Sequence, residues 1–124
     1  MVVAVVLVVE DEVQVLVMVN SILADAGYQT LTAGTFAEAM AIIQSDKEID
    51  LLFTDLTLFG EIEGGLQLGR AFAETRPQTP VLYTTARGIT DGTIEMFVKP
   101  YGFVAKPYMP ADVLTAVKNL LDTS

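Results

Sequence analysis

Residues 3–12 read VAVVLVVEDE, an apolar run that three acidic residues end abruptly. The continuous run Val3–Val9 predicts a strand with both faces buried, as in a parallel sheet that helices cover on either side. The apolar stretch from Met1 to Val9 is nine residues long, whereas a bilayer crossing takes about 20. It also lacks the leading basic residues of a secretory signal, so we interpret it as a core strand.

Outward from this strand, short β-rich runs alternate with helical stretches. Val13–Ala26 begins with a strand-like alternation, but its length and Gly27 at its end favour a helix. Thr35 and Glu38 have the spacing of a capping box at the start of another helix. We expect helices at Val13–Ala26, Thr35 to about Gln44, Leu66–Thr75, Thr90–Val98 and Ala111–Leu121, and further strands at Gln29–Ala33, Leu51–Thr54, Val81–Thr84 and Gly102–Ala105.

This alternation implies one α/β domain over residues 1–124, built on a five-stranded, doubly wound parallel sheet. Right-handed crossovers place helices on both faces of such a sheet. A chain of 124 residues buries roughly two-thirds of its unfolded surface, so it needs no disulfide. Ligands of such sheets bind beyond the carboxyl ends of the strands, which makes the residues at those ends candidates for a functional site.

The composition excludes several classes of site and partner. The chain has no cysteine and no histidine, which excludes disulfides, thiolate and histidine-ligated metal sites, and the common serine–histidine and cysteine–histidine nucleophiles. Lys and Arg number 7 against 16 Asp and Glu, for a formal net charge of −9. Nucleic-acid binding needs clustered cations. We therefore expect no nucleic-acid partner. Because we interpret no segment as a membrane span or an export signal, we also expect no membrane partner and a cytoplasmic location.

Polar residues follow four of the predicted strands, namely Glu10, Asp11 and Glu12, then Asp55, then Thr84 and Thr85, and finally Lys106. Carboxylates gathered in one pocket repel one another unless a cation compensates, and Mg²⁺ prefers carboxylate, water and phosphate oxygens. A lysine and a threonine nearby suit a phosphoryl group, and an aspartate can itself be the nucleophile. The pattern predicts Mg²⁺-assisted phosphoryl transfer to a carboxylate.

With these motifs in this order, the chain resembles the receiver domains of two-component response regulators over essentially its whole length. The resemblance rests on the acidic run Glu10–Glu12, on Asp55 after Leu51–Thr54, on Thr85-Ala86 and on Lys106-Pro107-Tyr108. It implies a flavodoxin-like (βα)5 fold with strand order 2-1-3-4-5. It also implies a signalling phosphoacceptor, not a conventional enzyme, that catalyses its own phosphoryl transfer and its own dephosphorylation.

The resemblance implies a Mg²⁺ site made mainly of carboxylates. Asp11 matches the direct metal ligand, and Glu10 matches the neighbouring acid that often acts through water. Asp55 and the backbone carbonyl of Thr57 match further metal ligands. Thr57 and Arg87 also match positions that tune the lifetime of the aspartyl-phosphate.

The resemblance also assigns the residues that handle the phosphoryl group. Asp55 matches the phosphoacceptor, which takes this group from a partner's phosphohistidine. Thr85 matches the hydroxyl that hydrogen-bonds the phosphoryl group, and Lys106 matches the cation that pairs with it. Phe103 matches the aromatic switch residue that reorients together with Thr85 on activation.

The chain departs from the common receiver pattern in four places. The first acid is Glu10 rather than aspartate, and its longer arm is expected to shift water-mediated metal binding. Phe59 stands where a proline is usual, which predicts a differently shaped loop after Asp55. Phe103 lacks the hydroxyl of the frequent tyrosine. The stretch from Arg87 to Gly102 lacks the usual alanine-rich pattern, so its helix is expected to be short or mobile.

Simpler interpretations exist for single residues of this set. Glu10–Glu12 alone is also typical of a helix N-terminus that the helix dipole favours, and Asp55 alone is also typical of a turn or helix cap. Thr84 is an alternative to Thr85. We favour Thr85 because the small Ala86 that follows it leaves room for a phosphoryl group.

The lysine of the site also has a competitor. Lys99 and Lys106 each begin a Lys-Pro-Tyr triplet. Lys106 lies 21 residues past Thr85, which leaves room for a helix and a strand, whereas Lys99 lies only 14 residues past it. We therefore assign Lys106 to the site and interpret Lys99 as a loop residue.

The resemblance implies a sensor histidine kinase or a histidine phosphotransfer protein as the phosphodonor. It also allows a downstream protein partner and a homodimer formed on phosphorylation. The first helix is unusually apolar, and its valines outnumber what one buried stripe accommodates. We hypothesise that its exposed valines, such as Val13 and Val17, dock a helical hairpin of the kinase. The alternative is that neighbouring parts of the same chain cover this helix.

Four classes of protein are candidates for the whole chain. The leading one is a stand-alone receiver domain. A receiver from a hybrid histidine kinase is the second, since Gly64 lies nine residues past Asp55 and this spacing, with the Phe-Thr-Asp lead-in, looks like that group. An Asp-dependent phosphatase of the haloacid dehalogenase type usually has a second aspartate where Thr57 stands. A flavodoxin-like FMN module needs a phosphate-binding loop that the acidic run Glu10–Glu12 would repel.

Overall fold

The structure is a computed structural model that describes residues 3–61, 64–85 and 100–123. A five-stranded parallel sheet forms the centre of this part of the chain. The strand order is β2-β1-β3-β4-β5, which confirms the predicted fold class and order. The strands are β1 (Val5–Val9), β2 (Gln29–Ala33), β3 (Leu51–Asp55), β4 (Val81–Thr85) and β5 (Tyr101–Ala105). Because all of them are parallel, their carboxyl ends lie at one edge.

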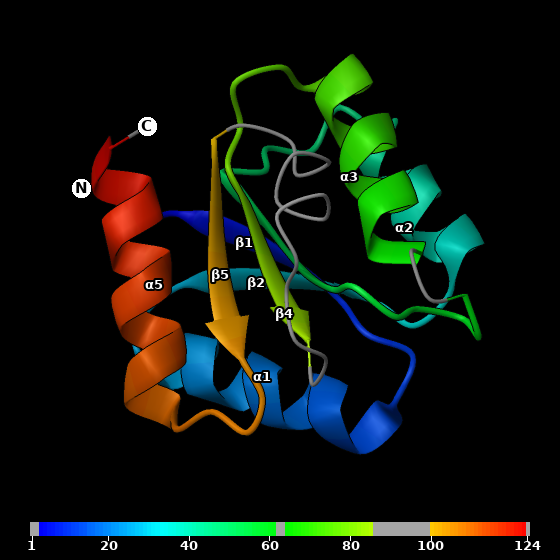
Figure 1. The fold of residues 1–124 in the computed structure, drawn as a ribbon. Helices are drawn as coiled ribbons and strands as arrows, with labels where there is room; N and C mark the ends of the chain where they lie inside the picture. Colours follow the sequence, from blue (N-terminus) through cyan, green and yellow to red (C-terminus); the bar gives the residue numbers. More distant parts are fainter. Residues whose placement is uncertain (1–2, 62–63, 86–99, 124) are drawn as a thin grey trace.

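Two helical layers cover the sheet (Figure 1). The described helices are α1 (Val13–Asp25), α2 (Phe36–Ile43), α3 (Gly64–Thr75) and α5 (Pro110–Thr123). Figure 1 shows α1 and α5 on one face and α2 and α3 on the other. Two apolar clusters fill the spaces between the sheet and the helices. The cluster under α1 and α5 includes Val8, Leu23 and Val117. The cluster under α2 and α3 includes Leu7 and Phe72. Alternate residues of each strand supply the two clusters, since successive side chains point to opposite faces.

Helix α1 is a helix despite its strand-like alternation. Gly27 has a φ of 97°, and its N–H donates to the carbonyl of Ala24, while the N–H of Tyr28 donates to the carbonyl of Leu23 (3.0 and 3.1 Å). This pair of bonds is the Schellman motif that ends many helices with a glycine. The glycine signal therefore identified the element correctly, and the burial of Leu23 anchors it to the sheet.

A variant of the predicted capping box is present at the start of α2, in which Glu38 reaches back to Gly34 rather than to the N–H of the N-cap Thr35. The Thr35 Oγ1 accepts a hydrogen bond from the N–H of Glu38 (3.1 Å), and the Glu38 Oε1 accepts one from the N–H of Gly34 (2.9 Å). These two bonds fix the first turn of α2 next to the carboxyl end of β2. Phe36, the first residue of the helix, is placed by them.

The element boundaries differ from the predicted ones by one or two residues. The first strand begins at Val5 rather than Val3, α3 begins at Gly64 rather than Leu66, and β4 continues through Thr85. The helix predicted at Thr90–Val98, together with Ala86, Arg87 and Lys99, lies outside the described residues. No helix in the described ranges is long and apolar enough to cross a membrane.

Candidate functional site

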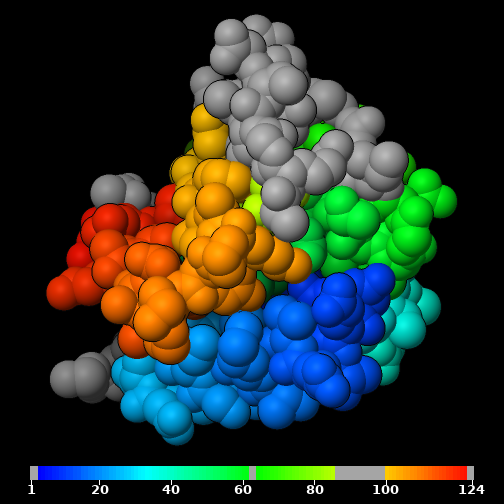
Figure 2. Space-filling model, turned by 60° about the horizontal axis from the view of Figure 1, so that its bottom comes forward, coloured from blue at the N-terminus to red at the C-terminus, as the bar shows by residue number. Residues whose placement is uncertain are grey.

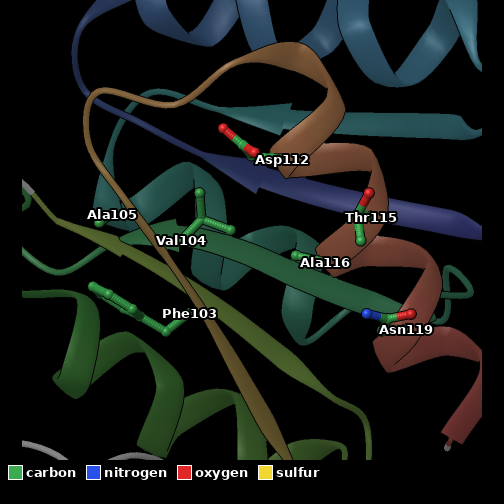
Figure 3. A pocket seen from close by; sticks show the side chains of 7 residues that line it. All are labelled: Phe103, Val104, Ala105, Asp112, Thr115, Ala116 and Asn119. Atoms are coloured by element: carbon green, nitrogen blue, oxygen red, sulfur yellow. The ribbon is translucent and has the colours of Figure 1, made fainter.

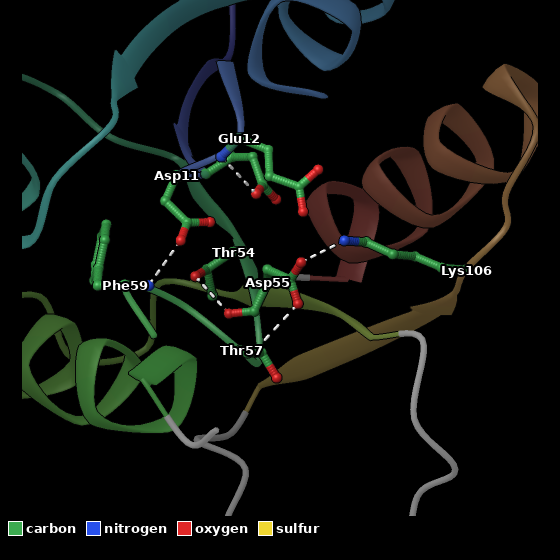
Figure 4. Close-up of polar contacts among 8 residues, drawn as sticks. Asp11, Glu12, Thr54, Asp55, Thr57, Phe59 and Lys106 are labelled. Carbon is green, nitrogen blue, oxygen red and sulfur yellow. Dashed lines mark hydrogen bonds and ion pairs between the residues drawn. The ribbon is translucent and has the colours of Figure 1, made fainter. Parts of the chain in front are cut away.

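The predicted site residues converge at the carboxyl edge of the sheet (Figure 4). Glu10 directly follows β1, Asp55 is the last residue of β3, Thr85 is the last residue of β4, and Lys106 directly follows β5. Strand β3 pairs with β1 on one side and with β4 on the other. Asp55 therefore stands in the middle of the edge, where the other strand ends surround it.

Asp55 is a buried carboxylate held from two sides. Asp55 is only 6% exposed. Its Oδ2 forms an ion pair with the Nζ of Lys106. Its Oδ1 accepts a hydrogen bond from the backbone N–H of Thr57 at 3.1 Å. Burial alone would lower the pKa of Lys106, but the hydrogen bond and charge of Asp55, together with Glu10, raise the pKa above its ordinary value. The lysine is therefore a constant positive charge beside Asp55.

Glu10 is more deeply buried than Asp55, at 1% exposure. Its Oε1 accepts a hydrogen bond from the N–H of Glu12 (3.1 Å), whereas its Oε2 has no hydrogen-bond partner among the described residues. Burial is the main cause that raises the pKa of Glu10 to about 7, and the negative charge of Asp55 adds to it. A buried carboxylate with one unsatisfied oxygen and a nearby second carboxylate is a site that a cation would stabilise.

Asp11 lies beside them on the exposed side of the edge. Its Oδ2 accepts a hydrogen bond from the backbone N–H of Phe59 at 2.9 Å, which ties the residue after β1 to the loop after β3. Among the described residues, no group of three His, Cys, Asp or Glu side chains is arranged to hold a metal ion. Mg²⁺ typically takes one or two carboxylates and keeps several waters, so its site needs no such group. The donor set of Glu10, Asp11, Asp55 and the carbonyl of Thr57 fits that ion.

The two threonines at the end of β4 face opposite sides of the sheet, because neighbouring strand residues alternate. Thr84 pairs in register with Asp55, and parallel register partners point to the same face. Thr85 lies on the other face, which is the face of Phe103. Both threonines are buried, and the Thr84 Oγ1 has no hydrogen-bond partner among the described residues. Thr85 and Phe103 are thus on one face of the sheet, and Thr84 and Asp55 are on the other.

Phe103 does not join the carboxylate cluster. Its ring packs against the apolar cluster on the α2 and α3 side, while Val104, its neighbour, faces α5. A hollow of about 460 Å³ lies between β5 and α5, lined among others by Phe103, Asp112, Thr115 and Asn119. Figure 3 shows that the side chain of Phe103 points away from α5. This hollow lies apart from the Asp55–Lys106 pair.

A second groove adjoins the site itself. It is lined by Glu12, Val15 and Met18 of the α1 side and by Lys106, Pro107 and Tyr108 of the segment after β5. Figure 2 shows these two segments against each other, with α1 in blue and the segment after β5 in orange. The Lys106–Pro107 peptide bond is cis. The surface of α1 beside the groove is apolar, since Val13 is 71% and Val17 57% exposed.

Sequence reasoning missed two contributors to the site. One is Gly65: a Cβ at this position would lie 2.0 Å from the carbonyl oxygen of Asp55, so only glycine lets α3 approach β3 this closely. The N–H of Gly65 donates to the carbonyl of Leu56 at 2.8 Å. The adjacent glycines at 64 and 65 were the available signal. The other is the amide of Phe59, for which the sequence carries no signal.

The chain matches the family described as "Response regulator receiver domain" over residues 6–118. It is similar to the phosphate regulon transcriptional regulatory protein PhoB of Pseudomonas aeruginosa, with 31% identity over 119 residues, 94% of this chain and 51% of that protein. It is also similar to the uncharacterized transcriptional regulatory protein YbdJ of Bacillus subtilis, with 26% identity over 117 residues, 94% of this chain and 50% of that protein.

A solved structure shows the same likeness in three dimensions. The response regulator receiver protein from Sinorhizobium medicae has a TM-score of 0.85 and 27% identity, with coverage of 97% of this chain and 95% of that chain. The chain spans about half the length of the two curated relatives named above.

Proposed function

Because the chain belongs to the family of response regulator receiver domains, we propose that it accepts a phosphoryl group on Asp55 and signals through the conformational change that follows. The observation that carries the proposal is the buried Asp55 carboxylate, paired with Lys106 and flanked by Glu10 at the carboxyl edge of the sheet. No other described aspartate combines burial, a lysine partner and neighbouring acids in this way. As a receiver, the chain acts as one signalling unit, for which the cytoplasm is the proposed location.

The proposed donor is the phosphohistidine of a sensor histidine kinase or of a histidine phosphotransfer protein. The chain has no histidine, so this residue must come from the partner. One oxygen of Asp55 attacks phosphorus, the P–N bond breaks, and the imidazole leaves with the electron pair of that bond and takes up a proton. The product is an aspartyl-phosphate and a neutral histidine, and attack by water later regenerates Asp55 and inorganic phosphate.

The chain's own residues supply the electrostatics of this transfer. Lys106 balances the negative charge of the incoming group, which lies next to a carboxylate that would otherwise repel it. Asp11, Asp55 and the carbonyl of Thr57 would bind Mg²⁺ directly, and Glu10 would do so through water. Bound Mg²⁺ would neutralise charge that develops on the phosphoryl oxygens. The N–H of Thr57, which meets Asp55 in this structure, orients its carboxylate.

The proposed response to phosphorylation runs through Thr85 and Phe103. The hydroxyl of Thr85 would hydrogen-bond the new phosphoryl group, and Thr85 would thereby move toward Asp55. Phe103, on the same face of the sheet, would follow into the space that Thr85 leaves. Phe103 has no hydroxyl, so the change would be transmitted by packing rather than by a hydrogen bond of this side chain. A downstream protein or a second copy of the chain would recognise the altered surface.

We propose that the partner docks on α1. The predicted exposure of its valines is present: Val13 and Val17 are 71% and 57% exposed and Met18 45%. This apolar surface adjoins the groove next to Lys106 (Figure 2), so a helix bound there would reach the site. Val17→Ser should slow phosphotransfer from the partner kinase. It should leave the rate with a small phosphodonor unchanged, and a loss of both rates equally would contradict docking at α1.

The decisive experiment for the proposed function uses a small phosphodonor such as acetyl phosphate or phosphoramidate. The intact mass of the protein is measured promptly, with and without Mg²⁺. We expect one labile, Mg²⁺-dependent phosphoryl adduct that is absent from Asp55→Asn and retained by Asp46→Asn, a control at an exposed aspartate. No adduct on the folded wild-type protein would overturn the proposal.

Two other functions give different results in the same samples. A phosphatase of the haloacid dehalogenase type would turn over a phosphomonoester. Its second aspartate is replaced by Thr57, which meets Asp55 through its backbone N–H. An FMN-binding module would carry a yellow chromophore, but Glu10 and Asp11 border the place where its phosphate would lie. Neither has an observation in its favour.

A further inference from the structure

We propose that Phe59 and Phe36 are positioning residues for the metal site: the amide of Phe59 holds the Asp11 carboxylate, and the ring of Phe36 holds Phe59. The inference rests on the proposed function, since it concerns Asp11 as a metal ligand. The two aromatic residues act on Asp11 and not on Asp55: Phe59 contacts Asp11, and Phe36 contacts Phe59.

The loop after β3 is a tight two-residue turn. Leu58 and Glu61 pair as an isolated antiparallel bridge, and each donates its N–H to the other's carbonyl (3.0 and 2.8 Å). The two central residues, Phe59 and Gly60, have positive φ values of 56° and 79°. Positive φ at both central positions is the pattern of a type I′ turn, which normally takes Asn, Asp or Gly. A bulky aromatic residue in this conformation is unusual, so something in the tertiary structure must hold it there.

One support is the hydrogen bond to Asp11. The turn directs the N–H of Phe59 toward the Asp11 Oδ2, at 2.9 Å. Figure 4 shows one oxygen of Asp11 on this amide and the other pointing away from Phe59. The bond joins residues 48 apart in sequence. It therefore restrains an exposed side chain that would otherwise exchange among rotamers.

The other support is the ring of Phe36. Phe36 and Phe59 meet edge to face, with ring centroids 6.2 Å apart and an interplanar angle of 90°, a favourable aromatic geometry. Phe36 is 40% exposed, so burial in the core does not explain its place. It is the first residue of α2, immediately after the capping box of Thr35 and Glu38.

These contacts form a continuous path from α2 to the metal site. The capping box fixes Phe36, Phe36 fixes the ring of Phe59, and the turn presents the amide of Phe59 to Asp11. Hydrogen-bonded groups behind a metal ligand orient it, and their loss typically costs about 10- to 100-fold in metal affinity. Without the aromatic contact, the turn would relax from its positive φ at Phe59 and its amide would leave Asp11.

The test compares Phe36→Ala, Phe59→Ala and the double variant with the wild type. Alanine keeps the N–H but has no ring to hold the positive φ at position 59, so this substitution removes the contact with Phe36 from the other side. Mg²⁺ binding is measured by calorimetry, and the wild-type, Phe36→Ala and Ile42→Ala proteins are also compared by NMR at the Phe59 amide, without metal. Ile42→Ala is the control: it also removes apolar bulk from α2 but lies six residues from Phe36, on the order of 9 Å along the helix.

We expect Phe36→Ala and Phe59→Ala each to weaken Mg²⁺ binding about 10-fold, and the double variant to weaken it no further, because both break the same contact. The Phe59 amide should shift upfield and exchange faster in Phe36→Ala, but not in Ile42→Ala.

Several results would overturn the inference. They are an unchanged Mg²⁺ affinity in Phe36→Ala, an equal loss in Ile42→Ala, or additive losses in the double variant. A wild-type protein that binds no Mg²⁺ would instead overturn the proposed function, and the inference with it. A wild type that binds Mg²⁺ while the variants match it would overturn the inference alone.

Discussion

Replacement of Glu10 by glutamine should change how the stability of this protein depends on pH. Glu10 is 1% exposed, and burial raises its pKa in the folded protein from 4.5 to about 7. An acid with a raised pKa holds its proton more tightly in the folded state than in the unfolded one. Its contribution to stability is therefore fully present below about pH 4.5 and is lost as the pH rises to about 7.

The size of the effect follows from the same two pKa values. A displacement from 4.5 to about 7 is worth about 3 kcal/mol at its limit, of which about 2.5 kcal/mol should be lost between about pH 5 and pH 8. Glutamine keeps the shape of the protonated acid and an oxygen for the N–H of Glu12, but it cannot ionise. The Glu10→Gln variant should therefore match the wild type near pH 5 and exceed its stability near pH 8.

The assay is urea unfolding of both proteins at several pH values, in the presence of a chelator. The difference between their unfolding free energies cancels the pH dependence of all other carboxylates. Glu12→Gln is the control that removes a carboxylate at an exposed neighbour. A flat difference for Glu10→Gln across this range would show that Glu10 is ionised in the folded protein, which would refute the reasoning from burial. Added Mg²⁺ should selectively stabilise the wild type near pH 8.

Three further substitutions test the packing and polar contacts around the site. Gly65→Ala places a Cβ 2.0 Å from the carbonyl oxygen of Asp55, so urea unfolding should show a loss of about 2–3 kcal/mol and the phosphoryl adduct should form more slowly. Arg76→Ala removes two hydrogen bonds from its guanidinium to the carbonyls at the end of α2 (3.1 and 2.9 Å), and its unfolding free energy should fall by about 1–2 kcal/mol; an unchanged midpoint would contradict this role. Thr84→Val replaces a buried hydroxyl that has no partner among the described residues, and thermal unfolding should show a neutral or slightly stabilising effect of up to about 1 kcal/mol. A clear destabilisation would mean that this hydroxyl is hydrogen-bonded.

Most of the fold was predictable because it depends on local patterns. The apolar runs identify strands buried on both faces, and the capping and glycine signals at Thr35 and Gly27 identify helix ends. The misplaced boundaries are those where no such signal stands. The first strand begins at Val5 because its register with β2 starts there, opposite Gln29, and Val3 is exposed. Nothing in an apolar run marks that point.

The identity of the site residues was also largely open to prediction. In a parallel sheet all the strands end at one edge, so any residues that follow the strands converge. That rule alone brings Glu10, Asp55 and Lys106 together. It does not decide between Thr84 and Thr85. Their roles depend on which face each occupies, and the register of β4 against β3 and β5 sets that.

The sequence by itself determined the order of elements, the parallel sheet and the set of polar groups at its edge, because strand and helix periodicities and end signals are local. Only the tertiary structure decided the depth at which Glu10 is buried, the approach of α3 to Asp55 at Gly65, and the bond from the amide of Phe59 to Asp11. Each of these depends on a distance between residues far apart in sequence. Such distances arise from the packing of whole layers, and no run of residues encodes them separately.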